Sequence, residues 1–70
     1  MLNECKLTEF GLAVKTEILK RGLSQEQLIE LVQEKTGLYI DRGYMYKILT
    51  GKRSPENIVA AIREILGLEA

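Results

Sequence analysis

The sequence predicts an all-α fold, a compact domain of four or at most five helices. Three observations support this prediction. Apolar residues recur three and four positions apart in four separate segments, which is the period of a helix with one buried face. Residues that cap helix starts and glycines that end helices stand between these segments. No sustained apolar–polar alternation and no Asn-Gly or Asp-Gly turn occurs, so strands are not expected.

The chain of 70 residues has room for one small domain, so we expect a single unit over residues 1–70. Its 46% hydrophobic and 29% charged residues are typical of a globular chain rather than a disordered one. No apolar run approaches the roughly 20 residues that cross a bilayer. Residues 1–4 also lack the features of a signal peptide. We therefore expect a cytoplasmic protein with no membrane partner.

A first helix is expected over about residues 8–21. Thr8 is a suitable N-cap, and Gly22 is a residue type at which helices commonly end. The apolar positions predict one buried stripe, made of Phe10, Val14 and Ile18 with Leu7 and Leu19 beside them.

A second helix is expected over about residues 24–36. Ser24 and Gln27 stand three residues apart, which predicts a capping box at the start of this helix. Gly37 is expected to end it. The predicted apolar face consists of Leu28, Leu31 and Val32, with Ile29 at its edge.

A third helix is expected over about residues 42–50, with Asp41 as N-cap and Gly51 as the stop. A fourth is expected over about residues 55–66, with Ser54 as N-cap before Pro55 at the first helical position. The predicted buried positions are Met45, Ile48 and Leu49 in the third helix and Ile58, Val59, Ile62, Ile65 and Leu66 in the fourth.

The composition argues against an enzyme. The chain has no His and a single cysteine, Cys5, so neither a His-based catalytic dyad nor a cysteine metal site is available. Glycine-rich phosphate loops are absent as well. We therefore expect no catalytic residues, no metal, no cofactor and no small-molecule ligand.

The charges are balanced overall but unevenly distributed along the chain. Ten basic and ten acidic residues give zero net charge, whereas a nucleic-acid-binding domain often has a clear basic excess. Between residues 42 and 53, however, Arg42, Lys47, Lys52 and Arg53 stand without any acidic residue. The third helix and the loop after it are therefore predicted to form a local basic patch.

The side of the third helix opposite its buried stripe is expected to carry Gly43, Lys47 and Thr50, with Tyr44 and Tyr46 on the flanks. Outward-facing donors, a small residue and nearby basic side chains are what insertion into the DNA major groove requires. A basic helix face that is merely solvated, with the tyrosines covering the edge of the core, is the alternative.

Two segments carry a resemblance to a known family. Residues 23–29 (Leu-Ser-Gln-Glu-Gln-Leu-Ile) resemble the start of the helix-turn-helix of the Cro/lambda-repressor-like family, the xenobiotic-response-element type regulators. Residues 44–55 resemble its second half, in which the recognition helix ends in Ile-x-x-Gly, then Lys or Arg, then Pro. The resemblance covers about residues 8–68. The connector through residue 40 is longer than the usual tight turn, as in a small phage-like variant, and we expect it to pack onto the core.

The resemblance implies a lambda-repressor-like domain and a sequence-specific, double-stranded DNA-binding transcriptional regulator, such as a repressor. It also implies a homodimer on DNA. The third helix would enter the major groove. The implied base contacts are Arg42, Gly43 and Lys47, and the implied backbone contacts are Gln25, Tyr44, Tyr46, Thr50, Lys52 and Arg53.

A helical protein-interaction or antitoxin-like adaptor that does not bind DNA is the alternative function. The zero net charge and the apolar connector Leu38-Tyr39-Ile40 favour it. The two hypotheses predict different surroundings for the basic residues. A DNA-binding domain would expose them on one face with Gln25, whereas an adaptor would neutralise them with Asp41 or glutamates of the second helix.

Overall fold

The computed structural model describes residues 7–68, which form four α-helices and no strand. The predicted all-α, four-helix class is confirmed, and every helix boundary lies within one residue of its predicted position. None of the helices in this part of the chain combines the length and apolar character needed to traverse a bilayer. The helices are α1 (Glu9–Arg21), α2 (Gln25–Thr36), α3 (Arg42–Leu49) and α4 (Glu56–Leu66).

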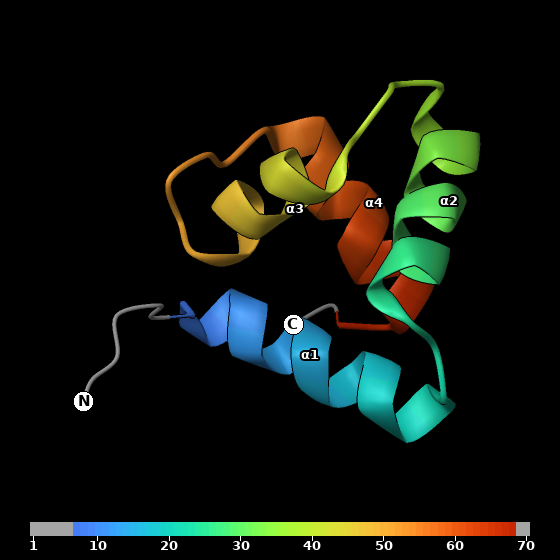
Figure 1. The fold of residues 1–70 in the computed structure, drawn as a ribbon, viewed down its shortest axis with the longest axis vertical. Coiled ribbons are helices and arrows are strands. Elements are labelled where there is room, and N and C mark those ends of the chain that lie inside the picture. Colours follow the sequence, from blue (N-terminus) through green and yellow to red (C-terminus); the bar gives the residue numbers. More distant parts are fainter. Residues whose placement is uncertain (1–6, 69–70) are drawn as a thin grey trace.

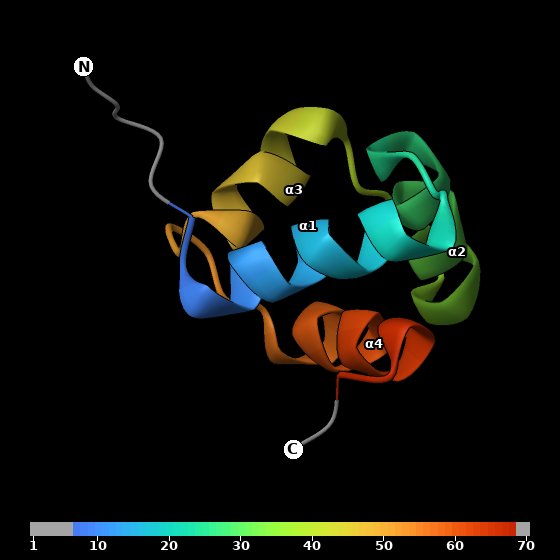
Figure 2. The same cartoon turned by 90° about the horizontal axis from the view of Figure 1, so that it is seen from below.

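The four helices enclose one core. Helix α4 packs against both α1 and α2, and α3 packs mainly against α1 with a smaller contact to α2 (Figure 1). Seen from below, α1 crosses between α3 on one side and α4 on the other, and α2 closes one end (Figure 2). The outer face of α1 therefore points away from the rest of the domain.

The core confirms most of the predicted apolar stripes but corrects three positions. Leu19 is 80% exposed and Leu31 is 38% exposed, whereas Ile29, expected at an edge, is buried. Each exposed leucine lies about 100° around its helix from the centre of the buried stripe, too far to reach the core. The buried apolar residues are Val14, Ile18, Leu28, Ile29, Val32, Ile40, Met45, Ile48, Leu49, Ile58, Ala61, Ile62 and Leu66.

Local capping explains why the helices begin where they do. The predicted capping box is present: Ser24 Oγ accepts from the Gln27 backbone N–H, and the Ser24 N–H donates to Gln27 Oε1. Asp41 caps α3, because its Oδ1 accepts from the Tyr44 N–H at 2.7 Å. The prediction for α4 was wrong by one residue. Its N-cap is Pro55, without a side-chain cap bond, so Ser54 lies outside the helix.

A backbone contact that the sequence did not predict joins α1 to α3. The Thr8 N–H and hydroxyl both donate to the Leu49 carbonyl oxygen, at 3.2 and 3.0 Å, while Thr8 Oγ1 accepts from the Gly11 N–H. Gly11 is buried against the same carbonyl, and a Cβ added at Gly11 would collide with it. The end of α3 is thus fixed to the first turn of α1.

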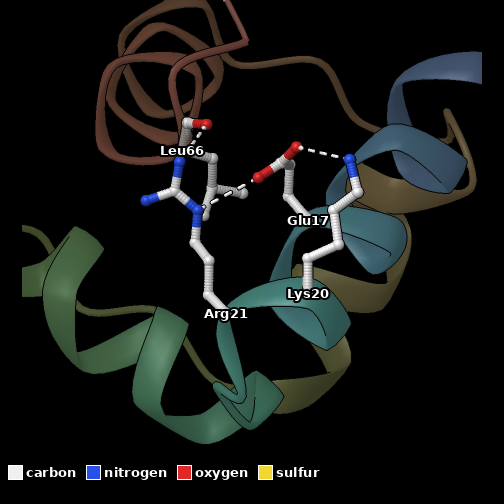
Figure 3. Close-up of polar contacts among 4 residues, drawn as sticks. All are labelled: Glu17, Lys20, Arg21 and Leu66. Carbon is white, nitrogen blue, oxygen red and sulfur yellow. Dashed lines mark hydrogen bonds and ion pairs between the residues drawn. The ribbon is translucent and has the colours of Figure 1, made fainter.

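A second contact joins the end of α1 to the end of α4 (Figure 3). The Arg21 guanidinium donates from Nε to Glu17 Oε1 at 3.0 Å and from Nη2 to the Leu66 carbonyl at 2.9 Å. The Lys20 ammonium lies 3.7 Å from the other carboxylate oxygen of Glu17. Glu17 therefore orients the guanidinium that ties the two helix ends together.

Replacing Glu17 by glutamine is expected to reduce the sensitivity of the fold to acid. The hydrogen bond from Arg21 lowers the pKa of Glu17, the charges of Lys20 and Arg21 add to this, and partial burial opposes it. Because the folded-state pKa lies below the unfolded value of about 4.3, the stabilisation is present above that value and is lost as pH falls through the folded-state pKa. Urea unfolding followed by circular dichroism measures the free energy of unfolding of the wild type and of Glu17→Gln between pH 7 and pH 2. The loss of stability with falling pH is expected to be smaller in Glu17→Gln.

The matched control is Glu34→Gln, which removes an exposed carboxylate of α2 that forms no ion pair within residues 7–68. This control is expected to keep the acid sensitivity of the wild type. Parallel pH profiles for Glu17→Gln and the wild type would contradict the role given to Glu17.

Candidate nucleic-acid interface

The outer side of α3 has the composition expected from the helical period. Met45, Ile48 and Leu49 are buried, so the opposite side of the helix faces solvent. Gly43, Tyr46 and Lys47 are exposed, and Thr50 is half-buried at the end of the helix. A Cβ added at Gly43 would meet Asp41 Oδ1 at 3.6 Å, an ordinary contact distance. This side of α3 is therefore open to a close partner.

The loop after α3 folds back onto the end of the helix. The Lys52 and Arg53 N–H groups both donate to the Lys47 carbonyl oxygen, at 2.8 and 3.2 Å. The Thr50 hydroxyl donates to the Tyr46 carbonyl at 2.9 Å. These bonds gather three exposed cations, Lys47, Lys52 and Arg53, which we call the basic end of α3. Within residues 7–68 no acidic side chain forms an ion pair with any of them.

Arg42, at the other end of α3, is paired. Its Nη2 lies 2.6 Å from Glu26 Oε2 in α2, and the two side chains are 68% and 65% exposed. An ion pair this exposed contributes only about 0–1 kcal/mol, because water screens both charges. A phosphate or a base edge could therefore replace Glu26 at little energetic cost. Of the four cations in residues 42–53, one is neutralised by a glutamate of α2 and three are not.

Gln25 lies close to Arg42. Together with Ser24 and Glu26 these residues line a shallow hollow where the first turns of α2 and α3 meet. Gln25 Oε1 also accepts a hydrogen bond from Lys15 Nζ of α1 at 3.2 Å. Lys15 thus adds a cation to this end of the surface. The sequence offered no signal for it, because Lys15 belongs to a different helix.

Tyr44 lies on the side of α3 that faces the connector. It is half-buried against the core and borders a hollow that Leu38, Tyr39 and Ile58 also line. Tyr46 is 43% exposed. Tyr44 therefore covers the edge of the core, and its predicted contact with phosphate stays a prediction.

The connector between α2 and α3 is held in place, as expected. Ile40 is 2% exposed, and its N–H donates to Gln33 Oε1 at 2.9 Å. The Leu38 N–H donates to the Thr36 hydroxyl at 3.2 Å. The side chain of Tyr39, in contrast, is 82% exposed. The connector therefore anchors the start of α3 to α2 while presenting an aromatic side chain to solvent.

No family model matches the chain, and no curated protein or solved structure matches it. In the part of the chain from residue 7 to residue 68, no three His, Cys, Asp or Glu side chains are grouped so that they could hold a metal ion. The surface formed by α3, the loop after it and the start of α2 is the best candidate for function.

Proposed function

We propose that this protein is a non-catalytic, sequence-specific regulator that binds double-stranded DNA as a homodimer, with α3 in the major groove. The observation that carries the proposal is the composition of the outer side of α3. It combines the open position at Gly43 with the basic end at Lys47, Lys52 and Arg53, whose cations have no acidic partner within residues 7–68.

The distribution of charge supports this orientation. The whole chain has zero net charge, and residues 42–53 contain four basic and no acidic residues. The remaining residues consequently carry four more acidic than basic side chains. A polyanion such as DNA is attracted to the basic end of α3, whereas the acidic residues nearest to this helix, Asp41 and Glu26, lie at its other end.

The proposed contacts divide into two groups. Lys47 and Arg42 would donate to guanine O6 and N7, and Gly43 would let the helix approach the base edges. Arg42 exchanges its exposed partner Glu26 for a base in this step. The contacts proposed for the DNA backbone, which set the position of the protein without reading sequence, are Gln25, Tyr44, Tyr46, Thr50, Lys52 and Arg53.

A protein-interaction module is the second candidate, and two observations favour it. Arg42 is paired with Glu26 of α2, as expected for a module that neutralises its basic residues. Leu38 and Tyr39 are 41% and 82% exposed beside a shallow hollow lined by Tyr44 and Ile58. Exposed apolar side chains around a hollow are typical of a docking site for another protein. Such a module would depend on Tyr39 and would tolerate the loss of Lys47.

Alanine substitutions at the basic end distinguish the two kinds of DNA contact. Arg53→Ala is expected to weaken binding evenly on all duplexes and to reduce the salt slope by about one unit. Lys47→Ala is expected to cost about 1–3 kcal/mol on the preferred duplex and to relax specificity at one base position. Fluorescence anisotropy with labelled duplexes at several salt concentrations measures both effects.

The control variant is Lys35→Ala, which removes the same charge from α2, where Lys35 pairs with Glu64 of α4 at 2.9 Å. Its salt slope is expected to match that of the wild type. If Lys35→Ala and Arg53→Ala change affinity and slope equally, the basic end of α3 has no special role and the proposal fails.

A further inference from the structure

The outer face of α1 carries an apolar stripe that no other helix covers. Leu12 and Leu19 are 58% and 80% exposed and lie two helical turns apart on the same side of α1. The exposed Thr16 lies between them. Val14 and Ile18 face the core on the other side. We call Leu12, Thr16 and Leu19 the outer stripe.

Opposite charges flank this outer stripe at its two ends. Glu9 and Lys20 are eleven residues apart, which is about three helical turns. Both side chains therefore lie along the same edge of the outer stripe. The midpoint of Glu9 and Lys20 falls within about one residue of the midpoint of Leu12 and Leu19. A two-fold rotation near residue 15 therefore exchanges the two leucines with each other and the acidic end with the basic end. The two leucines and the charged residues Glu9 and Lys20 can therefore each meet their counterparts in a second, antiparallel copy.

We propose that the outer stripe binds a second copy of this chain, with the two α1 helices packed antiparallel. In this arrangement Leu19 of one copy lies at Leu12 of the other, and Glu9 faces Lys20. The side chain of Leu19 would enter a shallow, mostly apolar hollow beside α1, which Leu12, Ala13, Thr16 and Leu68 line together with Glu9 and Glu17. Such a contact is isologous, because both copies use the same surface. It therefore forms a closed dimer and leaves neither outer stripe exposed.

The position of α1 in the fold fits this pairing. Helices α3 and α4 lie on opposite flanks of α1 (Figure 2). A two-fold axis that crosses α1 in the direction from α4 to α3 brings both copies of α3 to the same side of the dimer. A protein that reads two half-sites on one face of a duplex needs this arrangement. The use of the dimer rests on the proposed function, whereas the pairing itself does not require DNA.

One pair of short helices buries less surface than a stable interface usually does. The dimer is therefore expected to be weak in solution and to form fully where two copies are held side by side, as on adjacent half-sites.

Disulfide trapping without DNA tests the antiparallel register. In a Cys5→Ser background, Leu12→Cys and Leu19→Cys chains are mixed and oxidised. The mixed disulfide is expected to form about tenfold faster than either homodisulfide, because pairing raises the effective concentration of the two thiols. Identical positions in two antiparallel copies lie about 10 Å apart along the helix axis, beyond the reach of a disulfide.

Leu31→Cys in the same background is the matched control, because Leu31 is an exposed leucine of α2 outside the outer stripe. It is expected to cross-link slowly with every chain. Equal rates for all combinations would overturn the proposal, since they indicate random collision. This result would leave DNA binding by the wild type intact, whereas loss of the DNA proposal would leave the cross-linking pattern unchanged.

Discussion

Alanine in place of Gly11 is expected to destabilise the protein by about 2–4 kcal/mol, although alanine is the better helix former. The added Cβ would collide with the Leu49 carbonyl, a backbone atom that cannot rotate away. Moving α3 to make room would break the two bonds from Thr8 to this carbonyl. Overpacking of this kind costs about 1–3 kcal/mol, each lost hydrogen bond about 1 kcal/mol, and the gain in helix propensity offsets about 1 kcal/mol.

The matched control is the same substitution at the other helical glycine. Gly43 is exposed in α3, and a Cβ there makes only an ordinary contact. Gly43→Ala is expected to stabilise the fold by about 0.5–1 kcal/mol. Urea unfolding of both variants measures the difference. If Gly11→Ala also raised the free energy of unfolding, the close contact between α1 and α3 would not be a constraint on the fold.

Glutamate in place of Gly43 is expected to lower affinity for duplex DNA about 100-fold or more, because it places a carboxylate where α3 approaches the base edges and phosphates. The fold should persist. Gly43 is exposed in the first turn of α3, and an acidic side chain near a helix N-terminus is favourable. Anisotropy with a labelled duplex measures binding, and urea unfolding measures stability.

Two further variants at Gly43 separate charge from size. Gly43→Ala is expected to retain most of the binding, and Gly43→Gln, which has the size of glutamate without its charge, is expected to fall between them. Wild-type affinity in Gly43→Glu would place this side of α3 outside the DNA interface.

The parts of the fold that depend on neighbouring residues were predictable. The capping box at Ser24 and the cap at Asp41 follow from residues three positions apart, and the structure has both. Leu19 and Leu31 were placed with the core by mistake because both are apolar and next to a buried stripe, although each lies about 100° around its helix from the centre of that stripe. The contact at Gly11 was missed because nothing near Gly11 in sequence indicates that α3 passes beside it.

The same distinction applies to the candidate site. The exposure of Gly43 and Lys47 follows from the period of one helix, so the sequence was sufficient to predict it. The ion pair of Arg42 with Glu26 and the hydrogen bond from Lys15 to Gln25 each join two helices. These contacts depend on how the helices pack, which sequence spacing does not report.

The measurement that tests the proposed function most directly is selection from a random-sequence duplex library, at low and at near-physiological salt. The wild type and Gly43→Glu are carried through the selection side by side. We predict that the wild type enriches one common, roughly two-fold symmetric site at both salt concentrations, and that Gly43→Glu enriches none. Absence of a common site for the wild type, or binding that disappears with salt and is the same in both proteins, would contradict DNA recognition by α3. The exposed connector at Tyr39 would then be the surface to test for a protein partner.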